Sequence, residues 1–275
     1  MGRIFEALQR SSGKAETESP LIQLGVSAGV MGSIDSDTAD LERVRSLTPT
    51  PVPEHRLVTW SGERSPGAER IRILAARLRH LQDQRKIKKL LITSTVKDEG
   101  KTVLSANISI SLARSGQRVL LVDGDCHQAK AGHLLGANGL EGLTDWWRSG
   151  RAVQDYLTRI SGLPLWLLPA GSPVDQPVEI LQSERLSDLV SEMSNWFDWV
   201  VIDSPPSAPL ADASVWAKIA DGILLVAREG KTPKTLLRKV LDSLGTAKLL
   251  GTVLNDCSDP DQKYYKHYYN LPKKH

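Results

Sequence analysis

Residues 93–102 read Thr-Ser-Thr-Val-Lys-Asp-Glu-Gly-Lys-Thr, between the apolar run Leu90-Leu91-Ile92 and a helix-forming stretch that starts at Val103. Strand, loop, Gly-Lys-Thr and helix, in this order, are typical of a phosphate-binding loop. Successive backbone N–H groups of such a loop point at one spot, and the following helix adds its positive end. We therefore predict that Lys101 places its ammonium on the β- and γ-phosphates of a nucleotide. The hydroxyl of Thr102 is predicted to ligate Mg²⁺.

Two further apolar runs end in aspartate. One is Val-Leu-Leu-Val-Asp123, followed by Gly and Asp125, and the other is Trp-Val-Val-Ile-Asp203, followed by Ser-Pro-Pro. Apolar runs of this length indicate parallel strands buried on both faces, and the carboxyl ends of such strands are where doubly wound folds bind ligands. A lone aspartate there is more simply the cap of the next helix. Three of them beside Gly-Lys-Thr predict a site for a metal–triphosphate.

The alternation of strand and helix patterns predicts an α/β fold. We expect a doubly wound, mainly parallel sheet of the P-loop NTPase type, with helices on both faces and right-handed crossovers. The predicted strands are 90–94, 118–123, 165–168, 198–203, 222–227 and 249–254. The predicted helices are 68–84, 101–115, 178–181, 184–195 and 234–244.

The chain divides by composition into three parts. Residues 1–66 are predicted to be a short N-terminal helix and a flexible linker, because Ser, Thr, Pro, Gly and charged residues dominate without a lasting period. A short strand at 57–60 is included in that prediction. Residues 67–257 are the predicted nucleotide-binding domain, and residues 258–275 are a tyrosine-rich tail.

The tail holds four of the five tyrosines of the chain: Tyr264, Tyr265, Tyr268 and Tyr269. Two interpretations are open. The tail is either an aromatic helix edge that packs on the domain or a segment for docking or modification. The second is favoured, because the tyrosine pairs repeat four residues apart with Lys and His between them, which leaves the segment no polar face.

Composition excludes several classes of protein. The chain has 275 residues and a net charge of +3, an excess too small to indicate nucleic-acid binding. Cys126 and Cys257 are the only cysteines and lack metal-type spacing, which favours a reducing, cytoplasmic compartment. No apolar run is long enough to span a bilayer.

Together, the Gly-Lys-Thr motif, the two aspartate motifs and the tyrosine tail resemble the bacterial tyrosine kinases (BY-kinases) of capsule and exopolysaccharide export. The resemblance covers about residues 66–275 and includes Leu-Pro-Ala-Gly171 and Gly-Thr-Val-Leu-Asn255. It implies an ATP-dependent protein-tyrosine autokinase. Such an enzyme phosphorylates its own tail tyrosines in trans, within a ring of subunits, and regulates polysaccharide synthesis and export.

The resemblance also implies the residues of the site. Lys101, Asp123, Asp125 and Asp203 are the implied catalytic residues, with Asp123 near the phenol of the incoming tyrosine. Thr102, Asp125 and Asp203 are the implied Mg²⁺ ligands. Asn255 either reads adenine, as in the family, or is a turn or cap residue. The expected ATP-binding residues are Lys97, Asp98, Glu99, Gly100, Lys101, Thr102, Val103 and Asn255.

Partners follow from the same resemblance. The implied activator is a separate, membrane-embedded polysaccharide co-polymerase, which would hold the chain at the inner face of the cell membrane. A homo-oligomeric ring and a cognate tyrosine phosphatase are also implied, and nucleic acid is not.

Two positions depart from the family patterns. Where the family has the motif Asp-x-Asp-x-Arg, this chain has His127 in place of the arginine. Where the family has the helix motif Glu-x-x-Arg-x-x-Arg, this chain has Ala75 in place of the second arginine. Because that helix resembles a ring-forming contact, we expect a weaker ring here, or one that uses Arg77 instead.

A third position separates the chain from relatives in fold. Partitioning and cell-division ATPases carry a second lysine five residues before the Gly-Lys lysine, where this chain has Val96. Three functions are therefore weighed: a tyrosine autokinase, which the tail favours, a positioning ATPase, and a nucleotide-binding regulator without catalysis.

Overall fold

A central sheet organises the computed structural model, which describes Leu41 and residues 44–62, 65–208, 212–245 and 247–257. These residues all belong to one unit, residues 35–275. The described strands pair in the order β1-β4-β5-β3-β6-β2-β7-β8. Every neighbouring pair is parallel except β4 and β5. The strands are β1 (Arg45–Leu47), β2 (Lys89–Ser94), β3 (Val119–Asp123), β4 (Thr158–Ile160), β5 (Leu165–Leu168), β6 (Trp199–Asp203), β7 (Gly222–Arg228) and β8 (Leu249–Asn255).

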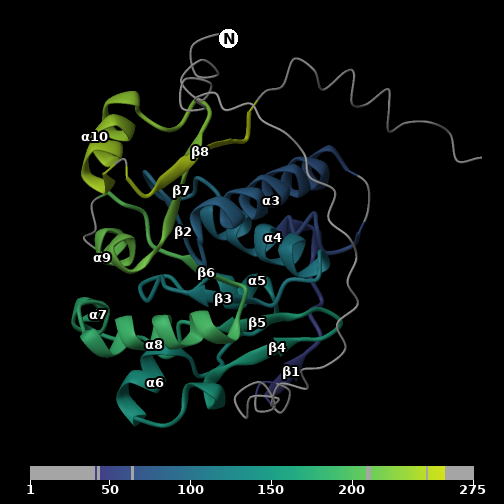
Figure 1. Cartoon of the computed structure of the whole chain (residues 1–275), viewed down its shortest axis with the longest axis vertical. Coiled ribbons are helices and arrows are strands. Elements are labelled where there is room, and N and C mark those ends of the chain that lie inside the picture. The colour runs from purple at the N-terminus through teal and green to yellow at the C-terminus, as the bar shows by residue number, and fades with distance from the viewer. Residues whose placement is uncertain (1–40, 42–43, 63–64, 209–211, 246, 258–275) are drawn as a thin grey trace, which may run out of the picture. The chain divides into compact units, whose positions relative to one another are not determined.

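Helices cover both faces of this sheet (Figure 1). The helices α3 (Pro66–Arg85), α4 (Lys101–Arg114) and α5 (Ala131–Leu134) contribute to the core on one face. The helices α6 (Leu143–Ser149), α7 (Pro177–Leu181), α8 (Glu184–Trp196) and α9 (Asp212–Ile219) contribute to the core on the other. The remaining described elements are α10 (Lys234–Leu244) and the 3-10 turns η1 (Pro53–His55) and η2 (Val153–Tyr156).

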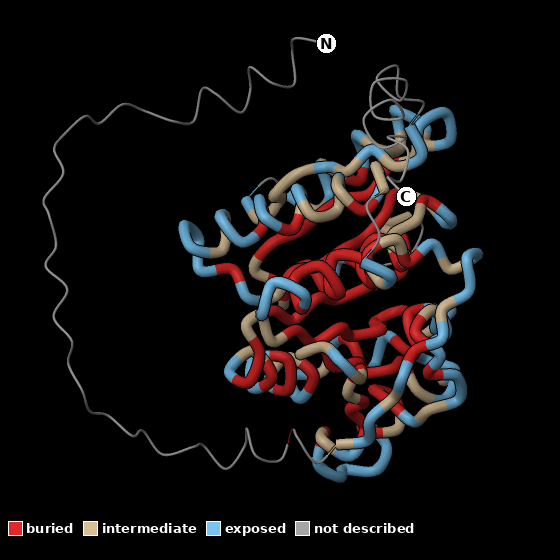
Figure 2. The backbone as a smooth tube through the Cα atoms, turned by 90° about the vertical axis from the view of Figure 1, so that its right-hand side faces the viewer, coloured by how far each residue is buried: buried red, intermediate tan, exposed pale blue. Residues whose placement is uncertain are grey.

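The two cores explain why the strands have continuous apolar sequences. Leu90 and Ile92 pack into the α3–α4 core, whereas Leu91, between them, packs into the core on the opposite face. Side chains of a strand alternate between faces, so a sheet covered on both sides needs apolar residues at every position. Figure 2 shows the result, with buried strands in the centre and exposed outer turns of helices.

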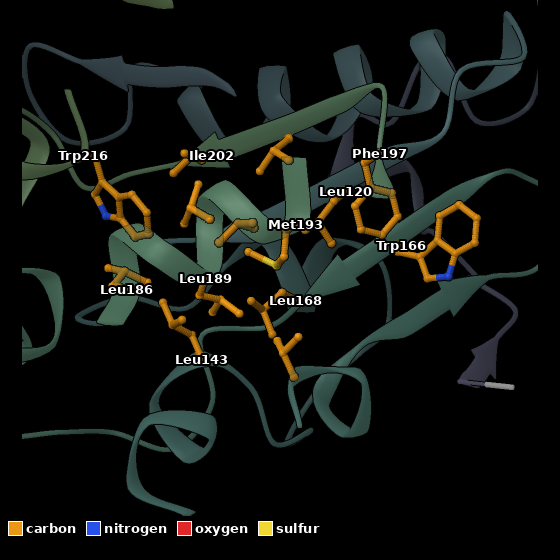
Figure 3. Packing of buried hydrophobic residues seen from close by; sticks show 14 of the residues in the cluster. Leu120, Leu143, Trp166, Leu168, Leu186, Leu189, Met193, Phe197, Ile202 and Trp216 are labelled. Carbon is orange, nitrogen blue, oxygen red and sulfur yellow. The ribbon is translucent and has the colours of Figure 1, made fainter. Parts of the chain in front are cut away.

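The α8 core illustrates the packing (Figure 3). Leu186, Leu189 and Met193 of α8 recur at helical spacing and meet sheet residues such as Leu120 and Ile202. The rings of Trp166 and Phe197 lie 5.3 Å apart at this core. The helix begins at Ser183, whose hydroxyl accepts the backbone N–H of Leu186.

The N-terminal boundary differs from the prediction, since residues 45–62 are packed and are not a flexible linker. Strand β1 pairs with β4, and Leu57 is buried in the α3–α4 core. The backbone N–H of Thr59 donates to the side chain of Asn107 on α4, at 3.0 Å. Residues 57–60 form turns and no strand. The contacts that fix this segment are made with residues distant in sequence, so no local periodicity of apolar residues reveals it.

The other predicted helices and strands agree closely with the structure. The structure also contains a few elements that the sequence did not predict. Each predicted strand from 90 onward and each predicted helix from 68 onward is present, with boundaries within about two residues. The unpredicted elements include β4, α5, α6 and α9, which are short or flanked by glycine. The predicted helix at the extreme N-terminus and the tyrosine tail lie outside the described residues. Across the described residues, no helix combines the length and apolar character needed to cross a membrane.

Candidate nucleotide and phosphoryl-transfer site

The predicted phosphate-binding loop joins the end of β2 to the first residue of α4. Lys101 begins α4, and Gly100 before it has φ 93°, a left-handed conformation that favours glycine. A Cβ atom at Gly100 would lie 2.2 Å from Nδ2 of Asn255, so no other residue fits there without displacing Asn255. Asp98 also has a positive φ, 62°, which aspartate tolerates better than most residues.

The buried side chain of Glu99 stabilises this loop through hydrogen bonds. Glu99 is fully buried, and its Oε2 accepts the backbone N–H of Val96 at 3.0 Å. Its Oε1 accepts the hydroxyl of Thr232, from the turn between β7 and α10. Nδ2 of Asn255 donates to the backbone carbonyl of Glu99 at 2.8 Å. The Glu99 carboxylate is therefore engaged inside the protein, and only the backbone of this residue is left to face a phosphate.

Thr232→Val is expected to weaken ATP binding about 3- to 10-fold while leaving the turnover number within about twofold. The change removes one partner of a buried carboxylate, which costs roughly 1–3 kcal/mol and loosens the loop. Thr232→Ser keeps the hydroxyl and should restore the affinity. The exposed Thr235, on α10, offers the matched control Thr235→Val. ATP titrations of the four proteins check the prediction, and unchanged affinity of the Thr232→Val variant would remove Glu99 and Thr232 from the positioning of the loop.

The strand ends bring together the predicted lysine and aspartates. Nζ of Lys101 lies 3.2 Å from Oδ2 of Asp125 and 3.3 Å from the hydroxyl of Thr102. Asp123 and Asp203 are direct neighbours in the β3–β6 register. Oδ1 of Asp203 accepts the hydroxyl of Ser105, one turn into α4, at 3.1 Å. The side chains of Lys101, Asp125 and Asp203 thus meet at one edge of the sheet.

Burial gives this cluster an unusual charge state. Burial, followed by the neighbouring charge of Asp203, raises the pKa of Asp123 to about 7. Burial also raises the pKa of Asp203 to about 6, against the opposing effect of Lys101. For Lys101, burial alone lowers the pKa, but the carboxylates of Asp203 and Asp125 outweigh it and raise the pKa, so the ammonium stays charged.

The structure gives Asp123 contacts that the sequence did not indicate. Asp123 is fully buried, and its Oδ2 accepts the backbone N–H groups of Ala131 at 2.9 Å and Gly132 at 3.4 Å. Its expected position near an incoming phenol stays a prediction. The carboxylate fixes the loop between Asp125 and α5, because both of these N–H groups belong to the start of that helix.

The donor atoms fit a magnesium ion. Oδ2 of Asp203 is buried and has no hydrogen-bond partner among the described residues, which leaves one carboxylate oxygen unsatisfied. Among the described residues, no three Asp, Glu, His or Cys side chains form a metal cluster. Mg²⁺ needs no such cluster, since it commonly uses one or two carboxylates, phosphate oxygens and water. Asp203, Asp125 and Thr102 supply suitable oxygens.

Two cavities flank the loop. One, of about 180 Å³, is lined by Lys97, Asp98, Lys101, Asp125, His127, Gln128, Lys130, Pro205 and Pro206. The other, of about 350 Å³, is bounded by apolar side chains of α3, α4 and β8, including Ile71, Leu74, Val103 and Leu254, together with Asn255. The first has the charged lining of a phosphate site, and the second has the apolar lining suited to a base.

The departures from the family motifs have structural counterparts. Nε2 of His127 lies 2.8 Å from Oδ2 of the buried Asp212, at the start of α9. Glu69 and Arg72 form an ion pair of 3.1 Å along α3. Ala75 is buried in the α3–α4 core and borders a cavity of about 260 Å³ that Arg72 and Arg79 also line.

The end of the described chain lies beside the loop. Arg228 pairs with Asp256 through Nε at 2.8 Å, and its Nη1 donates to the backbone carbonyl of Asp98 at 3.3 Å. The tail that carries the four tyrosines follows directly. Sequence reasoning missed Ser105, Thr232, Asp212 and Arg228, because none belongs to a motif and each acts through a contact distant in sequence.

Comparisons with known proteins agree with this geometry. A family model described as an AAA domain matches residues 98–230. The putative tyrosine-protein kinase CapB of Staphylococcus aureus is 31% identical over 206 residues, which cover 73% of this chain and 90% of CapB. The chain belongs to the bacterial tyrosine kinase family. The family predicted from the motifs is thereby confirmed.

Three further proteins are similar to this chain over different shares of their length. The succinoglycan biosynthesis transport protein ExoP of Rhizobium meliloti (strain 1021) is 36% identical over 177 residues, which cover 60% of the chain but only 22% of ExoP. The chimerical protein CapA2B2 superposes with a TM-score of 0.69 at 23% identity, covering 78% of this chain and 94% of that one. The septum site-determining protein MinD of Pyrococcus horikoshii OT3, complexed with Mg-ADP, gives a TM-score of 0.53 at 23% identity, covering 67% and 78%. These structures confirm the predicted fold class.

Proposed function

We propose that this kinase transfers the γ-phosphoryl group of ATP to tyrosines of its own C-terminal tail, in trans between subunits, and thereby regulates capsule or exopolysaccharide synthesis and export. The proposal depends most on the meeting of Lys101, Asp125 and Asp203 at one edge of the sheet. Its acceptors are Tyr264, Tyr265, Tyr268 and Tyr269. The kinase relatives, CapB among them, support it.

Each residue of the site has a role in this proposal. Backbone N–H groups of residues 98–102 bind phosphate oxygens, and the Lys101 ammonium moves from Asp125 to the β- and γ-phosphates. Thr102, Asp125 and Asp203 would hold Mg²⁺, which would supply neutralisation of the charge on the phosphates. Asp123 fixes the loop that carries Asp125. Asp123 also remains the proposed residue that orients the incoming tyrosine or accepts its phenolic proton.

The base of ATP occupies the apolar cavity beside Gly100 in this proposal. Val103 and Leu254 would pack against adenine, and Oδ1 of Asn255 would accept its amino group, since within the described part of the chain the Asn255 side chain bonds through Nδ2, to the carbonyl of Glu99. Asn255 then serves both of the roles that the sequence left open, since it braces the loop and borders the base.

Transfer in trans is compatible with the length of the tail. The acceptors Tyr264 to Tyr269 lie 7 to 12 residues after Cys257, a reach of about 23–40 Å for a chain extended at about 3.3 Å per residue. Each phosphate adds about −1.5 to −2 charges. A multiply phosphorylated tail would be repelled by the acidic edge that holds Asp123, Asp125 and Asp203, which provides a means of releasing neighbouring subunits.

We also propose partners for the kinase. It corresponds to only 22% of ExoP, a transport protein of succinoglycan biosynthesis, which supports its working with a separate membrane-embedded polysaccharide co-polymerase. That partner would hold it at the inner face of the membrane, and a tyrosine phosphatase would reverse the modification. A homo-oligomeric ring is retained in the proposal. Ala75 provides no arginine for its α3 contact, so Arg77, which is exposed on α3, is the proposed substitute.

Incubation of the full chain with Mg-ATP, followed by mass spectrometry of the tail, is expected to show phosphotyrosine within residues 264–269. ATP hydrolysis without tail phosphate would instead indicate a positioning ATPase. Nucleotide binding without hydrolysis or transfer would indicate a regulator that has lost catalysis. Addition of the membrane fraction that contains the co-polymerase should raise the rate, and an unaltered rate would count against the partner.

A further inference from the structure

The histidine that replaces the arginine of the family motif lines the phosphate cavity, and its ring is paired with an aspartate of another element. Nε2 of His127 lies 2.8 Å from Oδ2 of Asp212, a carboxylate that is only 3% exposed. This contact ties the loop after β3 to the start of α9. Position 127 is a histidine and supplies no guanidinium to the cavity, so other cations of the lining are the candidates to contact the phosphates, on whose charge phosphoryl transfer depends.

Lys130 lines the same cavity, three residues further along the same loop. Its ammonium has one described partner, Oδ1 of Asp98, at the long distance of 3.7 Å. The two side chains are 50% and 66% exposed, and ion pairs as exposed as this contribute at most about 1 kcal/mol. Asp98 belongs to the phosphate-binding loop, so the pair bridges the two loops that enclose the cavity. The ammonium is thus held beside the cavity by a contact that is easily exchanged.

The backbone around Lys130 is fixed on both sides. Gln128 donates its backbone N–H to Oδ1 of Asp125 at 3.0 Å, and Ala131 donates its own to Asp123 at 2.9 Å. The two aspartates that organise the site therefore also determine where Lys130 emerges. Lys97 lines the cavity too, but it belongs to the phosphate-binding loop, and these two aspartates do not fix its backbone.

We infer that Lys130 binds the γ-phosphoryl group and stabilises its charge during transfer. A triphosphate carries several negative charges and attracts the ammonium more strongly than the single, solvated carboxylate of Asp98 does. On ATP binding, Lys130 exchanges Asp98 for phosphate oxygens. This inference rests on the proposed function, because it places the γ-phosphate in the cavity beside Lys101.

The test compares Lys130→Met, which removes the charge but keeps most of the length, with Lys130→Arg, which keeps the charge. The expected effect of Lys130→Met is about a 5- to 10-fold weaker affinity for a non-hydrolysable ATP analogue, with the affinity for ADP changed less than twofold. The turnover number for tail phosphorylation should fall about 10- to 100-fold. Lys130→Arg should restore most of both. Lys239→Met, at an exposed position of α10, is the matched control.

The contrast between ATP and ADP separates a contact with the γ-phosphate from a structural role. Equal weakening of both nucleotides would show that Lys130 only tethers the loops, and no change would show that it has no role; either overturns the inference. An ATP-selective loss in Lys97→Met or His127→Ala, but not in Lys130→Met, would also overturn it. Should the wild-type chain bind ATP without phosphorylating its tail, the proposed autokinase fails, while the ATP–ADP comparison still decides the role of Lys130.

Discussion

Lys101→Met is expected to lower tail phosphorylation by at least about 10³-fold. The Lys101 ammonium is largely buried between Asp125 and Thr102, and its raised pKa keeps it charged at any physiological pH. Methionine retains the apolar stem but leaves the β- and γ-phosphates without their buried cation. Lys130, which also lines this cavity, cannot take the place of the buried cation, because its side chain is 50% exposed, compared with 11% for Lys101.

The same variant decides whether transfer occurs in trans. We would mix the Lys101→Met chain with a chain that has an intact site but phenylalanine at all four tail tyrosines. Only the inactive chain can then accept phosphate, so phosphotyrosine on its tail shows transfer between subunits. Absence of tail phosphate in this mixture, with normal phosphorylation of the wild type, would contradict transfer in trans and favour a tail that reaches its own site.

Lys239→Met is the control for this experiment too, and it should phosphorylate its tail at the wild-type rate. Lys101→Met also leaves Asp125 and Asp203 without their nearest cation, so some loss of stability at neutral pH is expected. Circular dichroism at the assay temperature separates unfolding from loss of chemistry. A folded Lys101→Met chain with substantial activity would exclude Lys101 from phosphate binding.

Asp203→Asn is expected to abolish the kinase reaction and, at the same time, to stabilise the nucleotide-free protein. The catalytic loss follows from the removal of a predicted Mg²⁺ ligand whose Oδ2 has no other described partner. The gain in stability follows from the cost of burying a charge. With the pKa of Asp203 raised from 3.8 to about 6, ionising this group in the folded state costs about 3 kcal/mol, at 1.36 kcal/mol per unit. Asparagine avoids that cost but leaves a buried amide partly unpaired, so a net gain of about 1–2 kcal/mol at pH 8 is expected.

The sign of the pH dependence follows from the raised pKa values. Asp203 and Asp123 hold protons in the folded state up to about pH 6 and 7, whereas the unfolded chain releases them near pH 4. Between these limits the native state binds more protons, so the free energy of unfolding falls as pH rises from about 4 to 7. This contribution levels off above about pH 7, when both groups are ionised in both states.

Urea unfolding of the nucleotide-free protein at pH 4, 5, 6, 7 and 8 measures this effect. Other groups add their own pH dependence, so the informative quantity is the difference between the wild type and Asp203→Asn. The gain in stability of the variant should be near its maximum above pH 7, fall to zero between pH 4 and 7, and become a loss of about 1–2 kcal/mol near pH 4, where only the penalty of the buried amide remains. Asp242→Asn, at a position on the exposed part of α10, is the matched control. If the difference in stability between the two proteins did not change with pH, burial would not raise the free-energy cost of ionising Asp203.

The sequence alone determined most of what depends on local pattern. Apolar runs ending at Ile92, Asp123 and Asp203 predicted the central strands, because a strand covered on both faces needs apolar residues at every position. Gly-Lys-Thr102 predicted the loop, because its spacing reflects backbone geometry at one turn. The carboxyl ends of parallel strands share one edge of the sheet, so the meeting of Lys101, Asp125 and Asp203 could also be predicted.

Only the tertiary structure decided how individual side chains are used. It buried Asp123 against the start of α5, directed the Glu99 carboxylate toward Thr232, paired His127 with Asp212 and placed Lys130 beside the phosphate cavity. It also packed residues 45–62 onto the domain through β4 and α4. The physical reason is common to all of these: each depends on a partner far away in the chain, and burial and charge are settled by what surrounds a side chain in three dimensions, which no local period records.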